Sequence, residues 1–253
     1  MPDEILLLSS TTSESANLIQ LMDRTGEDRL IDREIQHGKI CGASVSAVVT
    51  GIGAVNTARV LTCALERSRP RMVLQIGVGG AYLSSGLEVG DVAVADREIY
   101  GDLGVIAPDG WHSTEFIGIP ILTTLDSSGK VENHYNEYPI DQGLAESSID
   151  AISAADWGQN PPAIASGTFV TVNQCSGVAE VGNEIASRFG GICENMEGAA
   201  AAHLCLLYKV PFVEVRSISN RVEDRNFEAW DIPMAISHLH VAVSAILQDM
   251  GTR

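Results

Sequence analysis

The fold class of this chain is decided by the stretch VPFVEVRSISN, residues 210–220. Five of its first six residues are apolar, which predicts a strand covered on both faces. Arg216, Ser217, Ser219 and Asn220 then follow together, where strands of α/β folds meet their ligands. The stretch therefore predicts an α/β protein with a polar site at the end of this strand. It also raises the question of why the strand ends on an amide, which cannot act as an acid.

The rest of the chain alternates between strand-like and helix-like segments. This alternation predicts one domain over residues 1–253, a three-layer α/β/α fold around a central mixed, largely parallel twisted sheet. The expected strands are Glu4–Ser10, Ala43–Thr50, Met72–Val78, Asp91–Ile99, Ala163–Val172 and Val210–Ser219; the expected helices are Ser13–Arg24, Ala54–Arg69, Ala179–Phe189, Glu197–Tyr208 and Ile232–Met250.

Residues 100–142 interrupt this alternation. They contain Pro108, Pro120 and Pro139, several glycines and exposed-looking aromatics. This composition predicts an irregular excursion. Long loops inside a compact domain usually form a lid or a partner contact. A surface insertion without a role is an equal alternative.

Composition argues against several classes of partner. The net charge is −17, so nothing basic favours a nucleic acid or an anionic membrane surface. No apolar run approaches the roughly 20 residues that span a bilayer. The five cysteines are scattered, odd in number and without a CxxC pair, which is typical of free thiols in a reducing compartment. We expect a cytoplasmic protein.

Glycine-rich segments and histidines indicate no cofactor. GIGAVN (51–56) and GVGGAY (77–82) carry Asn56 and Tyr82 where a dinucleotide loop needs a third small residue. Their glycines still allow backbone N–H groups to approach a ligand. The six histidines form no HExxH or comparable set, and His238 and His240 do not share a helix face. No metal is expected.

Six segments in order carry a family resemblance: GIGAVNTA (51–58), IGVGGA (76–81), VGDVAVAD (89–96), SGTFV (166–170), ENMEGAAAAHLC (194–205) and VPFVEVRSISN (210–220). Together they resemble the nucleoside phosphorylase/nucleosidase superfamily over almost the whole chain. The general pattern is similar to the methylthioadenosine/S-adenosylhomocysteine nucleosidases. GTFVTV, ENMEGAA and SISNRVEDRNFEAW look most like the futalosine hydrolases, which release hypoxanthine from futalosine in menaquinone biosynthesis.

The resemblance assigns two acidic residues to the reaction. Glu197 would accept hydrogen bonds from the ribose hydroxyls and favour a cationic sugar, although a carboxylate also suits a first helical turn. Glu14 would activate the attacking water, or form half of a capping box with Thr11 or Thr12.

Around these two, the resemblance implies a substrate-binding shell. Arg216 would hold the water and the carboxylates, or make a strand-end salt bridge, and Met196 would pack against the sugar. Ser219 would steady the neighbouring amide. Val78 stands beside Gly79 where the family has a serine, which removes one hydrogen bond from the expected site.

The purine would lie against the strand SGTFVTV. Phe169, Val170 and Thr171 are the candidates for this wall. Phe169 and Val170 point to opposite faces, so either Phe169 belongs to the core or the strand is shifted relative to the family pattern.

Asn220 occupies the position of an aspartic acid that protonates N7 in the adenine-specific enzymes. An asparagine NH₂ offers two donors to N7 and O6 of a 6-oxopurine, whereas an ionised aspartate offers none. The amide could instead satisfy local strand-end groups.

The resemblance therefore implies a hydrolase of purine nucleosides, most closely of the futalosine type, which needs a nucleoside and water and works as a homodimer or higher homo-oligomer. A phosphorylase, an adenine-type nucleosidase and a non-catalytic nucleoside-binding protein are the alternatives. Candidates for contact with the group beyond the ribose are Trp111, Phe116, Phe227, Trp230 and Arg225.

Overall fold

The computed structural model describes residues 4–126 and 128–252. The stretch that ends on a polar cluster forms β14 (Phe212–Val222), which pairs in parallel with β5 (Met72–Tyr82). β14 also pairs antiparallel with β6 (Val92–Tyr100). It is therefore held from both sides, and its apolar half is buried as its composition predicts.

The main sheet has the strand order β11-β6-β12-β13-β5-β1-β4-β3-β2, with β14 off this path. Parallel pairs such as β1–β4, β1–β5 and β12–β6 form its centre, while β2, β3 and β11 add antiparallel edges, so the predicted mixed sheet is confirmed. The remaining strands of this sheet are β1 (Ile5–Ser9), β2 (Asp23–Leu30), β3 (Arg33–Ile40), β4 (Ala43–Val49), β11 (Glu137–Pro139), β12 (Ile164–Thr171) and β13 (Gly191–Asn195).

Part of this sheet closes on itself. β14 joins β5 to β6, β6 pairs with β12, β12 with β13, and β13 returns to β5. The five strands thus form a closed ring of pairings inside the larger sheet, as in a small barrel. Two side chains that lie far apart in the sequence can meet inside such a ring.

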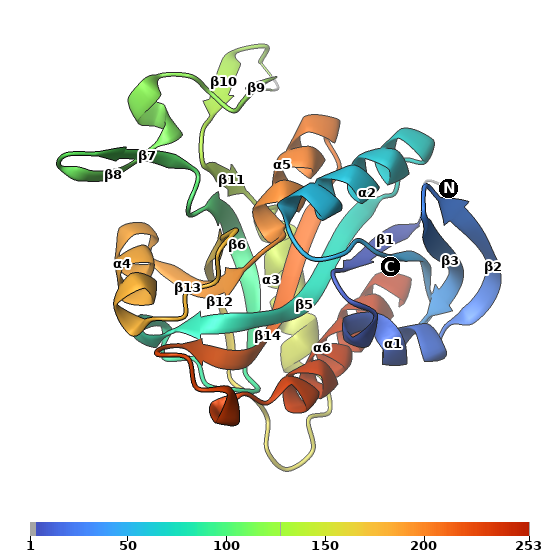
Figure 1. Ribbon diagram of the computed structural model, residues 1–253. Helices are drawn as coiled ribbons and strands as arrows, with labels where there is room; N and C mark the ends of the chain where they lie inside the picture. Colours follow the sequence, from blue (N-terminus) through green and yellow to red (C-terminus); the bar gives the residue numbers. More distant parts are fainter. Residues whose placement is uncertain (1–3, 127, 253) are drawn as a thin grey trace.

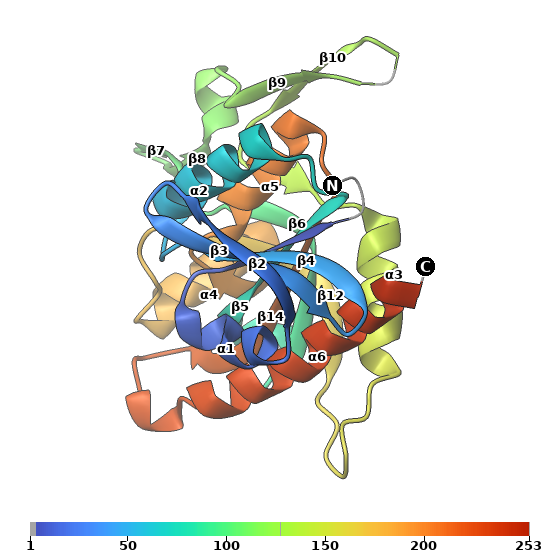
Figure 2. The same ribbon diagram turned by 90° about the vertical axis from the view of Figure 1, so that its right-hand side faces the viewer.

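Helices cover both faces of the sheet, so the predicted three layers are present (Figures 1 and 2). α2 (Ala54–Arg67) and α5 (Gly198–Tyr208) pack on one face, where Leu61 and Ala201 join the core. On the opposite face lie α1 (Thr12–Gln20), α3 (Gln142–Ser153) and α6 (Ile232–Thr252). α4 (Ala179–Phe189) closes a smaller core against β13 and β5.

Residues 100–142 contain more regular structure than the irregular excursion expected. β7 (Gly104–Ala107) pairs with β8 (Gly110–Ser113), and β9 (Leu122–Leu125) pairs with β10 (Val131–His134). A 3-10 helix, Thr114–Ile117, lies between the two hairpins. Both hairpins project away from the main body, at the upper left of Figure 1.

The N-terminal region also differs from the sequence prediction. α1 ends at Gln20 and not at Arg24, because Asp23 and Arg24 already belong to β2. β2 and β3 form a hairpin whose first strand is almost wholly exposed and charged. Such an edge strand carries little of the apolar alternation from which strands are recognised.

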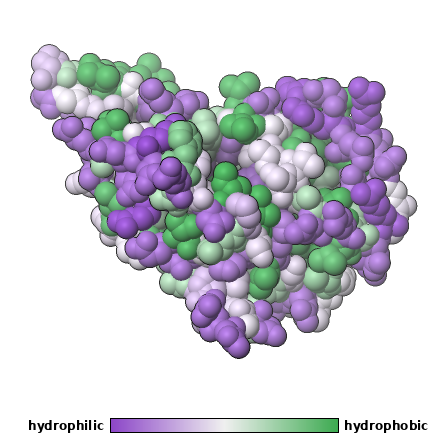
Figure 3. All heavy atoms as spheres, turned by 60° about the horizontal axis from the view of Figure 1, so that its bottom comes forward, coloured by the Kyte–Doolittle hydropathy of each residue, from purple (hydrophilic) through white to green (hydrophobic). Residues whose placement is uncertain are grey.

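α6 is a helix of 21 residues that is apolar over much of its length. Residues Phe227–Thr252 are long and apolar enough to cross a membrane by length and composition alone. In the structure Leu239, Val243 and Ile246 of α6 are buried in the core beneath the sheet, which accounts for its hydropathy. The face that comes forward in Figure 3, with the bottom of Figure 1 toward the viewer, mixes hydrophilic and hydrophobic groups.

Candidate active site

A cavity of about 280 Å³ opens where β1, β5 and β14, all parallel, reach their carboxyl ends. This is the edge at which α/β folds present ligand sites. Eight of the residues expected from the sequence line it: Glu14, Val78, Gly79, Met196, Glu197, Arg216, Ser219 and Asn220.

Glu14 has two roles in the structure, since it closes the first turn of α1 and also lines the cavity. Its Oε2 accepts from Thr11 N (2.8 Å) and Ser10 Oγ (2.7 Å), and the capping box with Thr11 is present. Its Oε1 accepts from the backbone N–H of Val78 at 3.0 Å. The capping interpretation and the cavity position are therefore compatible, and the side chain is only 4% exposed.

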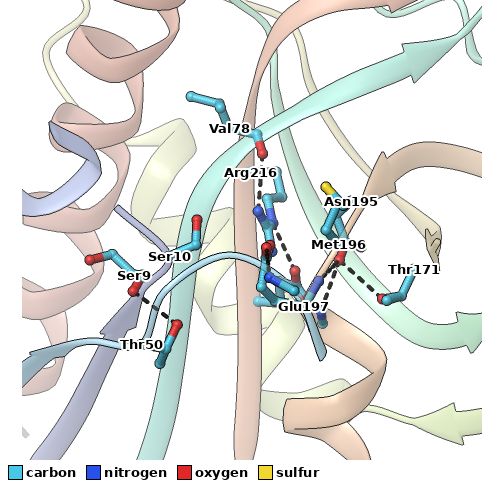
Figure 4. A network of polar contacts seen from close by, with 12 residues as sticks. Ser9, Ser10, Thr50, Val78, Thr171, Asn195, Met196, Glu197 and Arg216 are labelled. Carbon is cyan, nitrogen blue, oxygen red and sulfur yellow. Dashed lines mark hydrogen bonds and ion pairs between the residues drawn. The ribbon is translucent and has the colours of Figure 1, made fainter. Parts of the chain in front are cut away.

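Arg216 lines the cavity and joins Glu197 to the backbone of Val78 (Figure 4). Its NH2 donates to Glu197 Oε2 at 3.0 Å, and its NH1 donates to the carbonyl of Val78 at 3.0 Å. Burial alone would lower the pKa of Arg216, but Glu214, Glu197 and Glu14 together raise it above its ordinary value. The guanidinium is a fixed cation that orients the carboxylates around it.

Glu197 is held from two directions. Its Oε1 accepts from Gly53 N at 2.9 Å, while Oε2 faces Arg216. Gly53 has φ 93°, a left-handed conformation that glycine adopts without strain. The GIGAVN turn thus brings a backbone N–H to a site carboxylate, and the two oxygens keep further acceptor capacity toward the cavity.

Gly77 allows this close arrangement. A Cβ at this position would lie 2.5 Å from Arg216 NH1 and 2.8 Å from Glu14 Oε1. The two groups consequently approach the backbone of β5 directly, and they lie within about 5 Å of each other, which strengthens their attraction in a buried site. The segment GVGGAY forms the last part of β5 itself and is not a separate loop after the strand.

Asn220 is fixed by its neighbour. Ser219 Oγ donates to Asn220 Oδ1 at 2.9 Å, and Asn220 Nδ2 donates to the carbonyl of Arg221 at 3.1 Å. One N–H of the amide remains directed at other partners, and the residue lines the cavity. The arrangement presents a donor at the strand end.

The strand β12 does not supply the expected wall. Phe169 and Val170 are fully buried in two different hydrophobic clusters, on opposite faces of the strand. The hydroxyl of Thr171 donates to Glu98 Oε2 at 2.8 Å and accepts from Ala199 N. None of the three is among the residues that line the cavity, and the pairing of this strand with β13 and β6 shifts register near Thr168.

The cavity lining also includes residues that the sequence analysis did not single out. Cys175 and Ser176, in the turn after β12, line the cavity together with Glu194 of β13. Glu194 accepts from Ser176 N at 2.8 Å, and burial raises the pKa of its carboxyl. Met196 Sδ lies 3.3 Å from Cys175 Sγ, so the thioether packs at this side of the site. The segment ENMEG could have indicated Glu194 from the sequence, since Glu194 lies in it two residues before Met196.

The candidates for the far group separate into two sets. Arg225 and Trp230 line the cavity, with the guanidinium 5.3 Å from the Trp230 ring and 5.2 Å from that of Phe227. Trp111 packs instead on Phe189, and Phe116 stacks on His112 in the projecting segment, away from the cavity lining. Among the described residues Arg225 forms no ion pair at contact distance, but its charge acts on the Glu194 carboxyl of the same cavity and opposes the rise of the pKa of that group.

Two chemical features of the described residues complete the site. They contain no group of three or more His, Cys, Asp or Glu side chains that could hold a metal ion. All five cysteines are free, as their spacing predicts. The cavity gathers three carboxyl groups, two guanidinium groups and two side-chain amides, a set suited to proton transfer and charge stabilisation; they belong to Glu14, Glu194, Glu197, Arg216, Arg225, Asn195 and Asn220.

Comparison with known proteins places this site in a family. Residues 2–248 match the family model described as the Phosphorylase superfamily. A futalosine hydrolase of Thermus thermophilus is 30% identical over 205 residues, which cover 80% of each chain. A 5'-methylthioadenosine/S-adenosylhomocysteine nucleosidase of Mycobacterium bovis is 26% identical over 192 residues, or 72% of each chain. The chain therefore belongs to the phosphorylase superfamily, and the resemblance seen in its sequence is confirmed.

Solved structures show the same fold. The 5'-methylthioadenosine/S-adenosylhomocysteine nucleosidase of Neisseria meningitidis, in complex with methylthio-immucillin-A, matches with a TM-score of 0.81 at 20% identity, over 98% of this chain and 99% of that one. The futalosine hydrolase of Helicobacter pylori matches with a TM-score of 0.79 at 17% identity, over 98% of both chains. The predicted nucleosidase-like fold is confirmed, and its relatives are N-glycosyl hydrolases by name.

Proposed function

We propose that the protein hydrolyses the N-glycosidic bond of a purine nucleoside, and that its substrate is futalosine, from which it releases hypoxanthine for menaquinone biosynthesis. The observation that carries the proposal is the convergence of Glu14, Glu197 and Asn220 on one cavity. The identity of 30% with a futalosine hydrolase supports the choice of substrate.

Each group has a defined part in this reaction. Glu14 takes a proton from water as the water oxygen bonds to the anomeric carbon. Glu197 accepts hydrogen bonds from the ribose hydroxyls and stabilises the positive charge that develops on the sugar. The C–N bond breaks with its electron pair on the purine, which Asn220 stabilises by a hydrogen bond until solvent protonates it.

Charge at the cavity favours water over phosphate as the nucleophile. Among the residues that line it, Arg216 and Arg225 are the cations, and Arg216 is already paired with Glu214 and Glu197. Glu14 and Glu197 would repel an incoming phosphate. Phosphorolysis and binding without catalysis are therefore the alternatives that an experiment has to separate.

The test is a substrate panel. Pure protein is incubated with futalosine, aminodeoxyfutalosine, inosine and methylthioadenosine, each with and without phosphate, and free base is measured. Free hypoxanthine from futalosine without phosphate is expected. Strict dependence on phosphate would indicate a phosphorylase, preference for methylthioadenosine an adenine-type nucleosidase, and binding without release a nucleoside-binding protein.

We further propose that Arg225 and Trp230 hold the aromatic carboxylate that futalosine carries beyond the ribose. An aromatic ring and a guanidinium without an ion pair among the described residues suit a planar anion, and both line the cavity. Arg225→Ala should raise KM for futalosine about tenfold or more, the scale of one charge-assisted hydrogen bond. It should leave KM for inosine, which lacks this group, nearly unchanged.

For the assembly we propose a cytoplasmic homodimer. Val55 and Ile52, at the start of α2, are 81% and 56% exposed, and Ile52 lines the cavity. Exposed apolar groups beside a ligand site fit a partner subunit that completes the wall. Light scattering on the pure protein should give twice the chain mass. The Val55→Asp variant should have a lower mass and a higher KM than wild type.

A further inference from the structure

Two carboxyl groups lie fully buried beneath the proposed site, where the reaction gives them no direct part. Glu98 stands on β6 and Glu214 on β14, each 0% exposed. A Cβ at Gly198 would lie 2.0 Å from Glu98 Oε1 and 2.1 Å from Glu214 Oε2. These two oxygens are therefore within about 4 Å of each other. Two full negative charges at this separation, excluded from water, repel strongly.

The hydrogen bonds around the pair leave one atom without a partner. Glu98 Oε2 accepts from Thr171 Oγ1 at 2.8 Å, and Glu98 Oε1 accepts from Asn195 Nδ2 at 2.6 Å. Glu214 Oε1 accepts from Arg216 Nε at 2.8 Å. Glu214 Oε2 is buried without a hydrogen bond to any described protein donor. A proton placed between Glu214 Oε2 and Glu98 Oε1 would satisfy this atom and remove the repulsion.

Other titratable groups face the pair from several elements. Burial, followed by the charge of Glu214, raises the pKa of Glu98 well above its ordinary value. Burial also raises the pKa of Glu214, although Arg216 opposes this effect. The remaining neighbours are Glu197 at the start of α5, Cys193 of β13, Tyr82 of β5 and Tyr100 of β6. Burial raises the pKa of Cys193, Tyr82 and Tyr100, so these three stay neutral at physiological pH.

We propose that Glu98 and Glu214 share a single proton and act as a positioning pair, whose one negative charge orients Arg216 and, through Arg216, Glu197. The chain of contacts is continuous, because Arg216 donates Nε to Glu214 and NH2 to Glu197. A second charge on the pair would pull the guanidinium away from Glu197. The shared proton keeps the arginine divided between the two carboxylates.

The hydrogen bonds predict which of the two residues tolerates an amide. In Glu214→Gln, the new NH₂ donates to Glu98 Oε1 and the amide oxygen accepts from Arg216, so the arrangement and its single charge are kept. In Glu98→Gln, one orientation sets NH₂ against the NH₂ of Asn195. The other orientation leaves Glu214 Oε2 facing an oxygen. Both substitutions change a fully buried glutamate to its isostere, so each is the matched control of the other.

The first measurement is the infrared difference spectrum between wild type and Glu214→Gln at neutral pH. The carbonyl band of a protonated carboxylic acid should be present in wild type and missing in the variant. This measurement does not depend on the proposed function, and it is possible even where Glu98→Gln fails to fold. A difference spectrum without that band would overturn the proposal.

The second measurement rests on the proposed function and uses hydrolysis of inosine or futalosine. Glu214→Gln should keep kcat/KM within about threefold of wild type, while Glu98→Gln should lose about tenfold or more, because a buried polar group is left unpaired. Equal losses in the two variants, or a larger loss in Glu214→Gln, would contradict the shared proton. If no nucleoside is cleaved by wild type, the proposed function fails and the infrared result still decides the pair.

Discussion

Asn220 donates its side-chain NH₂ to the backbone carbonyl of Arg221 at 3.1 Å, and because a carbonyl can only accept, this contact fixes which end of the amide is a donor. The NH₂ group is thereby directed away from the serine. Under the proposed function, a base in the cavity would meet an N–H at the end of β14 and not an acceptor. This is the answer that the proposed function gives to a strand that ends on asparagine.

Asn220→Asp should reverse the discrimination between bases. An ionised aspartate has no donor and would face O6 of a 6-oxopurine with like charge. We expect kcat/KM for futalosine to fall by about a hundredfold or more, and the activity on aminodeoxyfutalosine to stay or rise. Comparison of kcat/KM for both compounds measures this, with Ser219→Ala as the control that frees the amide without removing it. A variant that still prefers the oxo compound would exclude this role for Asn220.

Glu14→Gln and Glu197→Gln should each lower kcat by about 10²-fold or more, the usual scale for a general base or an electrostatic stabiliser. Glutamine at the third helical position still supports a capping box, so Glu14→Gln should unfold at nearly the wild-type temperature. Steady-state kinetics and thermal unfolding on the same samples separate the two effects. Near wild-type turnover in Glu14→Gln would eliminate it as the group that activates water.

Gly198→Ala should be far more damaging than alanine in a helix usually is. The added Cβ would lie about 2 Å from oxygens of both Glu98 and Glu214, a contact that no side chain can accept without movement. We expect a loss of stability of about 3 kcal/mol or more, measured by urea unfolding. Gly190→Ala is the comparison variant. An added Cβ there meets open space, so any loss of stability comes from the left-handed φ of 63° and not from a clash.

Stability should depend on pH through the buried carboxyl pair. The pKa of Glu98 is raised on folding, so folding binds a proton that the unfolded chain has released above its ordinary pKa near 4.5. The contribution is complete below that value and is lost as pH rises toward the raised pKa. The unfolding free energy of wild type, minus that of Glu214→Gln, should therefore fall by about 1.4 kcal/mol per pH unit above pH ~5. A difference that is flat between pH 5 and pH 8 would show that no proton is bound on folding.

Most residues that line the cavity could be predicted because they lie in the motifs that carry the family resemblance. Glu197 belongs to ENMEG, and Arg216 and Asn220 belong to VRSISN at the polar end of a buried strand. β2 escaped prediction because seven of its eight residues are exposed, so no apolar alternation marks it. The position of Phe169 could not be predicted either, because the register shift in β12 has no signature in the sequence.

Contacts between distant strands were beyond any sequence pattern. Glu98 and Glu214 meet because β14 pairs antiparallel with β6 and closes the ring of strands. Glu98 directly follows Asp96 and Arg97 in β6, and Glu214 lies two residues before Arg216 in β14, so the sequence does not distinguish either glutamate from its charged neighbours. Their proximity could be seen only once the ring was known.

The capping box of α1 links the local opening of a helix to the chemistry proposed for the cavity. The carboxylate that closes this helix is the same one that accepts from Val78 at the cavity wall. If the first turn of α1 frays, Glu14 leaves its place, so under the proposed function the opening of this turn would lower the fraction of molecules competent for hydrolysis. Hydrogen exchange at the amide of Thr11 would then follow the same temperature course as the loss of activity, well below global unfolding.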